Sequence, residues 1–334
     1  MATEAQVRGY LLEEVLAWLL RNNGYELLTA PVPGDPALEV IGAGLAVRGR
    51  GARHQVDVLG EFPFTLPFSL PIRMFVEAKS YQLKDPVGLE VVRNAWATVA
   101  DVNEFDVGSS PHRYRYVYTL FSTSGFTAEA AEFALTHQVS LVDLTLPMYD
   151  ALRNAVARAA SAVHHDVLGT GAIERLRRIA RHVLGTAEVA MPRIPGGQRL
   201  LGAIQQLRSE LTASFGGKFL LAFPPAPFVL ALTGDIDEFL MSRTEQRVNI
   251  YPNTEDQTST GWIIQPAGHG DPDYTLYFSL PPHVDEWLMT DRRHARQLKQ
   301  TGLSSITIYQ LRDGLLRAYQ LRYEPRHRST RRPQ

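Results

Sequence analysis

Three side chains on two neighbouring apolar segments have the types and spacing of a hydrolytic metal site. Asp57 stands between two valines, and further along the chain Glu77 and Lys79 alternate with Val76 and Ala78. Because strand side chains point alternately to the two faces, Glu77 and Lys79 should project to the same side. Burying ionisable groups costs free energy unless they are paired, and a divalent cation is a suitable partner for carboxylates. The pattern is typical of a metal-dependent phosphodiesterase.

Hydrolysis of a phosphodiester with bound magnesium needs oxygen ligands for the ion and a source of hydroxide at neutral pH. Asp57 and Glu77 supply two carboxylates, and the backbone carbonyl of Ala78 offers a third oxygen. Lys79 can position or deprotonate the attacking water, or offset charge in the transition state. We favour charge stabilisation, because it requires no change in the pKa of the lysine. The expected cofactor is Mg²⁺, with Mn²⁺ as an ion that can substitute.

The composition limits the classes of protein to which the chain can belong. With 334 residues and 45% hydrophobic content, it is long enough for two domains with separate buried cores. The net charge is −1, but residues 1–160 carry an acidic surplus and the remainder a basic one. The absence of cysteine excludes disulfides, thiolate nucleophiles and sulfur-ligated zinc, and fits a reducing compartment. Neither a signal peptide nor an apolar run of about 18 residues is found, so we expect a cytoplasmic protein without a membrane partner.

The elements that must position the three side chains alternate between helices and strands. Apolar residues recur at spacings of three and four in residues 4–22, which predicts an amphipathic helix that stops at Gly24. Helical spacing returns later, and β-prone runs separate the helices. The predicted strands are residues 45–47, 55–59, 72–78, 114–121 and 140–144, and the later helices are residues 86–102 and 127–137. This order predicts an α/β fold with a mixed β-sheet core flanked by helices.

The second half of the chain has a different pattern. Residues 147–165 have helical spacing, and a Gly-Thr-Gly run at 169–171 follows as the predicted seam between domains. An arginine-rich helix at 172–184, another helix at 198–213 and several strand-like runs then predict a second, α+β domain. We therefore divide the chain into a first domain at 1–145, a helical connector at 146–170, a second domain at 171–325 and a basic, disordered tail at 326–334.

Three motifs in the first domain resemble a known family of nucleases. They are the run 53–58 around Asp57, the strand 76–79 that carries Glu77 and Lys79, and the Ser-Thr-Ser-Gly-Phe-Thr turn at 122–127 before a helix. Over residues 1–145 these motifs are similar to the Mrr-like (type IV restriction) branch of the PD-(D/E)XK nuclease superfamily. The resemblance implies a restriction-endonuclease-like fold and a magnesium-dependent endonuclease that cuts DNA in restriction or antiviral defence. The second half resembles no family that we recognise.

The resemblance also implies an acidic metal ligand on the first helix. Glu13 and Glu14 compete for this role, and the family spacing before the glycine that ends the helix selects Glu13. A helix turns about 100° per residue, so only one of the two can face the edge of the sheet. The alternative is that both are ordinary exposed carboxylates. Glutamate at position 77, where the family more often has glutamine, is the stronger metal ligand.

Further candidates each have a structural alternative. Gln55 shares the face of Asp57 and could contact the metal-bound water or the lysine, or be a plain edge-strand amide. Ser124 precedes a helix, where backbone N–H groups suit a phosphate, although simple N-capping explains it equally well. Arg175 and Arg178 could lie on a phosphate backbone, or form a solvated charged face. Tyr81, directly after the lysine strand, is an additional candidate for the DNA groove.

The leading hypothesis is an endodeoxyribonuclease whose C-terminal domain recognises the target or a trigger, such as an activating ligand. The alternative is a catalytically inactive nucleic-acid-binding or ligand-sensing module on a nuclease fold. Because one active site cuts one strand at a time, double-strand cleavage predicts a homodimer or a higher homo-oligomer.

Overall fold

The chain divides into two units, Met1–Gly216 and Gly217–Gln334. The computed structural model describes residues 2–42, 44–63, 70–105, 114–167, 169, 171–188, 197–215, 219–226, 228–253, 261–268, 271–280, 285, 299–312 and 315–325. The predicted tail at 326–334 lies outside these ranges. Within them, every helix is too short or too polar to cross a membrane.

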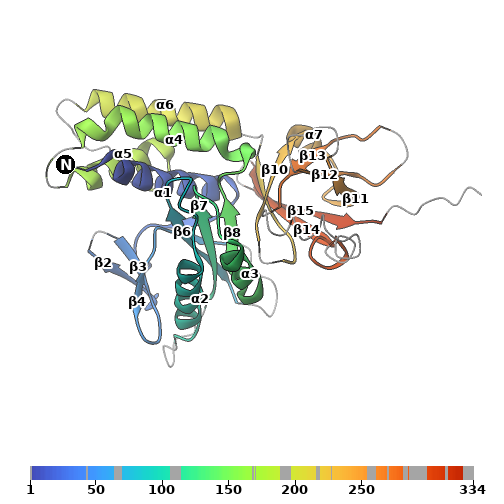
Figure 1. Cartoon of the computed structure of the whole chain (residues 1–334), viewed down its shortest axis with the longest axis horizontal. Helices are drawn as coiled ribbons and strands as arrows, with labels where there is room; N and C mark the ends of the chain where they lie inside the picture. Colours follow the sequence, from blue (N-terminus) through green and yellow to red (C-terminus); the bar gives the residue numbers. More distant parts are fainter. Residues whose placement is uncertain are drawn as a thin grey trace, which may run out of the picture. The chain divides into compact units, whose positions relative to one another are not determined.

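The first unit is built on a five-stranded mixed sheet in the order β1-β5-β6-β7-β8. The first three strands in this order pair antiparallel, and the last three pair parallel. The predicted mixed sheet flanked by helices is therefore confirmed (Figure 1). The strands are β1 (Glu26–Leu28), β5 (Val58–Glu61), β6 (Ile72–Lys79), β7 (Arg115–Ser122) and β8 (Ser140–Asp143).

Helices cover this sheet, and their sequences explain where they begin and end. Helix α1 (Glu4–Asn22) starts at a capping box formed by Thr3 and ends before Gly24, which has a φ of 85°. It packs against β5 and β6. Helices α2 (Leu89–Asn103) and α3 (Ala128–His137) bury their apolar faces on the side from which Phe75 and Tyr118 project, in one hydrophobic cluster.

Three further helices belong to the first unit, although the sequence suggested a domain seam among them. They are α4 (Asp150–Val163), α5 (Ala172–Leu184) and α6 (Gln198–Phe215). Helices α4 and α5 pack on α1, and α6 packs on both of them (Figure 1). The division therefore lies after α6 and differs from the predicted connector at 146–170. The glycines at 169 and 171 have positive φ and form a tight turn between two helices of one unit.

A predicted strand at 55–59 is broken in the structure. Strand β4 (Arg53–Gln55) pairs with β3 (Gly44–Arg48), which pairs with β2 (Leu38–Ile41) in a separate three-stranded sheet. The chain then bends and enters the main sheet as β5. Asp57 lies in this bend, directly before the first residue of β5. The bend places its side chain at the point where the two sheets diverge.

The second unit is a closed barrel of seven strands in the order β10-β13-β12-β11-β15-β14-β9. Large aromatic side chains, among them Trp262, Tyr274 and Tyr319, are fully buried in it. The prediction of an α+β domain is thus corrected to a barrel that carries a short helix, α7 (Ile236–Met241). The strands are β9 (Leu220–Phe223), β10 (Leu230–Gly234), β11 (Glu245–Pro252), β12 (Trp262–Pro266), β13 (Leu276–Phe278), β14 (Ser305–Arg312) and β15 (Leu315–Tyr323).

Candidate active site

The carboxylate of Asp57 is held at the end of strand β6. Its Oδ2 accepts a hydrogen bond from the backbone N–H of Ala78 at 2.9 Å. Since N–H and C=O of one strand residue point to the same side of the strand, the carbonyl of Ala78 also faces Asp57. Burial raises the pKa of Asp57 and the charge of Glu77 adds to this, whereas the Ala78 hydrogen bond and Lys79 lower it. The net effect is a raised pKa.

Glu77 and Lys79 project to the same side of β6, as their alternation predicts, and form an ion pair. The hydroxyl of Tyr118 on β7 donates to Oε2 of Glu77 at 2.5 Å. Burial alone would lower the pKa of Lys79, but the hydrogen bond and charge of Glu77 raise it above the usual value. The lysine therefore carries its proton at neutral pH, which suits charge stabilisation better than proton abstraction.

Glu13 approaches Asp57 from helix α1. Burial, followed by the charge of Asp57, raises the pKa of Glu13 to about 8. Arg177 on α5 opposes this shift, with its Nη2 at 2.9 Å from Oε2 of Glu13. Glu13 is thus the acid of the first helix that lies near Asp57, and it already has a cationic partner.

Glu14, the competing residue, is turned into the interface between α1 and α5. It is only 3% exposed and accepts from Nε of Arg177 at 2.9 Å. Nε of Arg181 lies 3.1 Å from both of its oxygens. The alternative in which both glutamates are exposed is therefore wrong. A buried carboxylate with two guanidinium partners holds the two helices together.

A cavity of about 300 Å³ joins the acids of α1 to Asp57. Its lining includes Tyr10, Glu13, Glu14, Gln55, Asp57 and Arg177, but neither Glu77 nor Lys79. Those two side chains lie outside this lining, each with about a quarter of its surface exposed (26% and 22%). Across the described ranges, no group of three or more acidic or histidine side chains is gathered closely enough to hold a metal ion. Asp57 is therefore near two ion pairs, Glu13 with Arg177 and Glu77 with Lys79. The acids of the two pairs do not gather around one point in the described part of the chain.

Gln55 lies beside Asp57 in the lining of this cavity, although on the small sheet. Its amide packs across Gly44, where an added Cβ would lie 2.7 Å from Nε2. The neighbouring His54 points elsewhere, with Nε2 at 2.7 Å from Oδ2 of Asp101 on α2. Gln55 thus remains a supporting candidate, and the histidine has a structural role.

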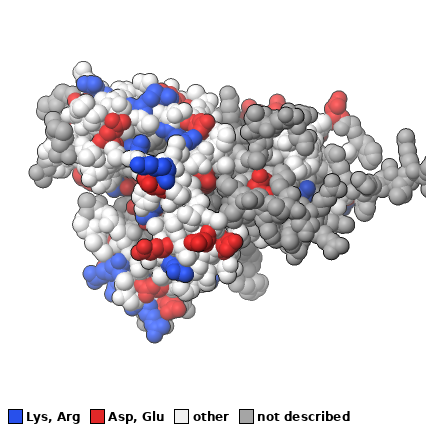
Figure 2. All heavy atoms as spheres, in the orientation of Figure 1, with Lys and Arg blue, Asp and Glu red and all other residues white. Residues whose placement is uncertain are grey.

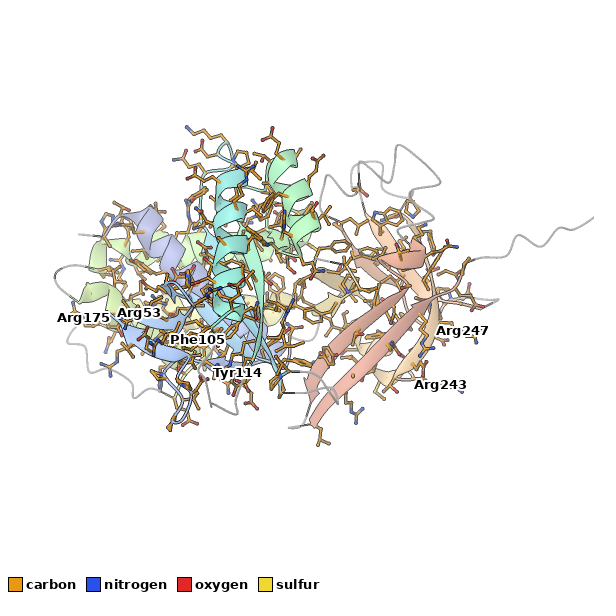
Figure 3. The ribbon with its side chains drawn as sticks, turned by 90° about the horizontal axis from the view of Figure 1, so that it is seen from below. Arg53, Phe105, Tyr114, Arg175, Arg243 and Arg247 are labelled. Carbon is orange, nitrogen blue, oxygen red and sulfur yellow. The ribbon has the colours of Figure 1, made fainter. Side chains whose placement is uncertain are left out.

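The residues proposed to contact nucleic acid have different environments. The hydroxyl of Ser124 is buried next to Ser122, at 3.2 Å, and the side chain that caps α3 is Thr127. The hydroxyl of Ser124 is therefore buried in this conformation and not open to a phosphate. Arg175 and Arg178 are exposed on α5, with Arg175 at the periphery of the first unit (Figure 3). Basic and acidic side chains are interspersed over the visible face of this unit (Figure 2).

Two contacts of the candidate acids, one with arginines of α5 and one with a tyrosine of β7, were not predicted from the sequence. The arginine-rich pattern of residues 172–184 suggests a basic face for DNA or solvent, but Arg177 and Arg181 of this helix contact the acids of α1. Tyr118 was assigned only to a β-prone run. Tyrosines at every second position, 114, 116 and 118, were the available signal, because residues at this spacing in an extended segment share one face. The first two contact the buried Arg73, and the third contacts Glu77.

Comparisons with known proteins identify no family. No protein-family model matches the chain, and no curated protein matches it. Among solved structures, the chain is similar to the crystal structure of AF1548, a protein of unknown function, with a TM-score of 0.35 and 16% sequence identity. That match covers 62% of this chain and 98% of the other.

Proposed function

We propose that this protein is a metal-dependent endonuclease that hydrolyses phosphodiester bonds of DNA, on a fold of the PD-(D/E)XK type. The observation that carries the proposal is the junction of β5 and β6. There the Asp57 carboxylate accepts from the Ala78 N–H, between Glu77 and Lys79 on the same strand. Two acids and a protonated lysine around one backbone amide suit the hydrolysis of a phosphodiester.

The donor set fits magnesium. Mg²⁺ is usually held by one or two carboxylates, with waters and substrate oxygens completing its shell. Asp57, Glu77 and the Ala78 carbonyl are such donors, so the absence of a three-acid cage among the described residues does not argue against it. Burial is the main cause of the raised pKa values of Asp57 and Glu13, and a neighbouring carboxylate adds to each shift, so a bound cation would favour their ionised forms. When bound, the ion supplies a more acidic water at neutral pH.

The side chains of the protein have separate roles in this proposal. Asp57 and Glu77 bind the cation, and Glu13 reaches the same site from α1 after it exchanges its contact with Arg177. Lys79 keeps its proton and stabilises the negative charge that develops on the phosphate. Tyr118 fixes the orientation of Glu77 through its hydroxyl.

The wider role follows from the resemblance to Mrr-like nucleases and stays a proposal. The first unit cuts, in restriction or antiviral defence, and the barrel recognises the DNA target or a triggering ligand. Arg243 and Arg247 are exposed on this barrel and could take part (Figure 3). Cleavage of both strands of a duplex requires two active sites, so a homodimer or a higher oligomer acts.

Nicking of supercoiled plasmid tests the activity. We expect the wild-type protein to nick DNA with Mg²⁺ or Mn²⁺ and not with EDTA, and the D57N and K79A variants to lose nicking. The R93Q variant, which changes an exposed arginine on α2 away from this site, is the control. Melting temperatures measure whether each variant is folded. Wild-type rates in folded D57N would refute the proposal.

One observation favours the alternative of an inactive binding module. Glu77 is already engaged by Lys79 and Tyr118, and Glu13 by Arg177. If these contacts persist, the protein binds DNA without cutting it. DNA binding by the wild-type protein in a gel mobility-shift assay, with no nicking of plasmid at any metal concentration, would establish this alternative.

A further inference from the structure

A second cavity, of about 350 Å³, opens at the carboxyl end of β6, one residue beyond Lys79. Helices α1 and α4 and the segment that follows β6 form its walls. Arg8 and Leu12 line it from α1, on the side roughly opposite Tyr10 and Ala17, which line the first cavity. The two cavities thus flank α1, and both lie near the candidate catalytic strand.

The charged side chains that line this second cavity are basic, whereas acids outnumber arginines in the lining of the first cavity. Its lining contains two arginines, Arg8 and Arg153, and no acidic side chain among the residues that the structure describes. Asp150 forms an ion pair with the Nη2 end of Arg153 from outside the lining. A cavity with these side chains attracts an anion, whereas the first cavity attracts a cation.

Two hydrogen-bonding groups in its wall lack partners. Oγ of Ser80 and Nε of Arg153 are both buried, and neither has a hydrogen-bond partner within the described part of the chain. An unmet buried donor costs free energy comparable to a lost hydrogen bond. Both groups can donate to an anionic oxygen such as that of a phosphate. Both atoms are shielded in this conformation, but their residues line the cavity, so a small rotation of either side chain would let it donate to an anion bound there.

An exposed aromatic ring stands at the same cavity. Tyr81 is 43% exposed, and Leu83 beside it is 66% exposed. The backbone is nevertheless fixed, because Thr123 donates from Oγ1 to the carbonyl of Tyr81 at 3.0 Å and from N to the carbonyl of Lys79 at 3.0 Å. An exposed ring on a fixed backbone offers a surface on which a nucleobase can stack.

We propose that this cavity binds one nucleotide of the DNA strand that is cut. Its phosphate faces Arg8, Arg153 and Ser80, and its base lies against Tyr81 and Leu83. The proposal rests on the proposed nuclease function and names a substrate subsite for it. Because Ser80 directly follows Lys79, this nucleotide lies close to the scissile phosphate. A free mononucleotide has the same chemistry, and the experiment distinguishes the two sources.

Fluorescence anisotropy of a labelled single-stranded oligodeoxynucleotide, in EDTA so that no cleavage occurs, measures the contact directly. We expect Y81A to weaken binding by about tenfold, and Y81F, which keeps the ring, to bind as wild type. R8Q should weaken binding several-fold and lower the slope of log Kd against log salt concentration by about one. R93Q is the charge-matched control and should bind as wild type.

The outcomes separate this inference from the proposed function. If the wild-type protein binds and nicks DNA while folded Y81A and R8Q bind equally well, the subsite is wrong and the nuclease stands. If deoxythymidine monophosphate binds and the oligonucleotide does not, the cavity serves a free nucleotide and our proposal fails. If the wild-type protein neither binds nor nicks DNA, both proposals fail. Should Y81A not fold, R8Q decides, since Arg8 is only partly buried.

Discussion

The two cavities beside helix α1 differ in whether their charged and polar groups have partners within the protein. In the first, Glu13 and Glu14 have arginine partners from α5, and Asp57 has a backbone donor. In the second, Arg153 and Ser80 each retain a buried group without a partner among the described residues. The same helix thus separates a region of carboxylates held by internal cations from a region of donors with unmet hydrogen-bonding capacity.

Because of this difference, the buried polar groups of the two cavities need different explanations. A satisfied ion pair such as that of Glu14 and Arg181 is explained by the fold, because it joins two helices. An unmet donor is not explained by the fold, since it costs free energy in the folded state. The first cavity therefore indicates where a cation could replace an arginine, and the second indicates where an anion could bind.

The largest expected effect appears when one variant from each cavity, D57N and R8Q, is compared in the same two measurements, nicking and binding. D57N should lower the rate of plasmid nicking by about a thousandfold or more and leave oligonucleotide Kd nearly unchanged, because the lost group acts on the reaction. R8Q should have the opposite pattern, with weaker binding and a nearly unchanged turnover at saturating DNA. Single-turnover cleavage over a range of protein concentrations separates the two quantities. Equal effects of both variants on turnover would remove the distinction between the cavities.

The next effect concerns stability. E14Q removes the anion that Arg181 shares with Arg177, although Arg177 keeps Glu13 and both arginines are only partly buried. The cost should therefore be at or below the about 3–5 kcal/mol of breaking a fully buried ion pair. R8Q removes a partly buried cation with no acidic partner among the described residues, so its free energy of unfolding should stay within about 0.5 kcal/mol of wild type. Urea unfolding followed by circular dichroism measures both. A stable E14Q variant would show that the α1–α5 contact does not depend on these charges.

The smallest change between neighbouring measurements is a dependence of stability on pH, which is spread over several pH units. The pKa of Glu13 is raised from 4.5 to about 8, so the folded state holds a proton that the unfolded state releases. The resulting stability is fully present below about pH 4.5 and is lost as pH rises towards 8, by at most about 1.4 kcal/mol per pH unit.

In E13Q this part of the dependence should disappear. The charged groups around position 13 are Asp57 and Glu14, which raise its pKa, and Arg177 and Arg181, which lower it. The difference between wild-type and E13Q free energies of unfolding, measured by urea titration at several pH values, isolates the contribution of Glu13. Parallel curves for the two proteins would contradict the raised pKa.

Local patterns in the sequence were sufficient for several features. The apolar spacing of residues 4–22 predicted α1, and the alternation at 76–79 predicted that Glu77 and Lys79 share a side of β6. The order of helices and strands predicted a mixed sheet flanked by helices. These features follow from interactions between residues close in the chain, namely helical spacing, capping and strand alternation.

Other features depend on partners that are distant in sequence. The predicted strand 55–59 is split because Gln55 and its neighbours pair with β3, while Val58 pairs with Val76 on β6. The second unit closes into a barrel through pairings such as that of β11 with β15, which a local pattern does not reveal.

The sequence by itself therefore determined which residues could do chemistry and placed Glu13, Glu77 and Lys79 on the correct kind of element, whereas Asp57 lies in a bend and not within the predicted strand. Tertiary structure decided which of them meet. Arg177 pairs with Glu13 and Glu14 across 163 and more residues of chain, and Tyr118 reaches Glu77 only because β7 pairs with β6. The physical reason is that helical and strand periodicity are local properties, whereas the pairing of buried charges depends on how distant elements pack.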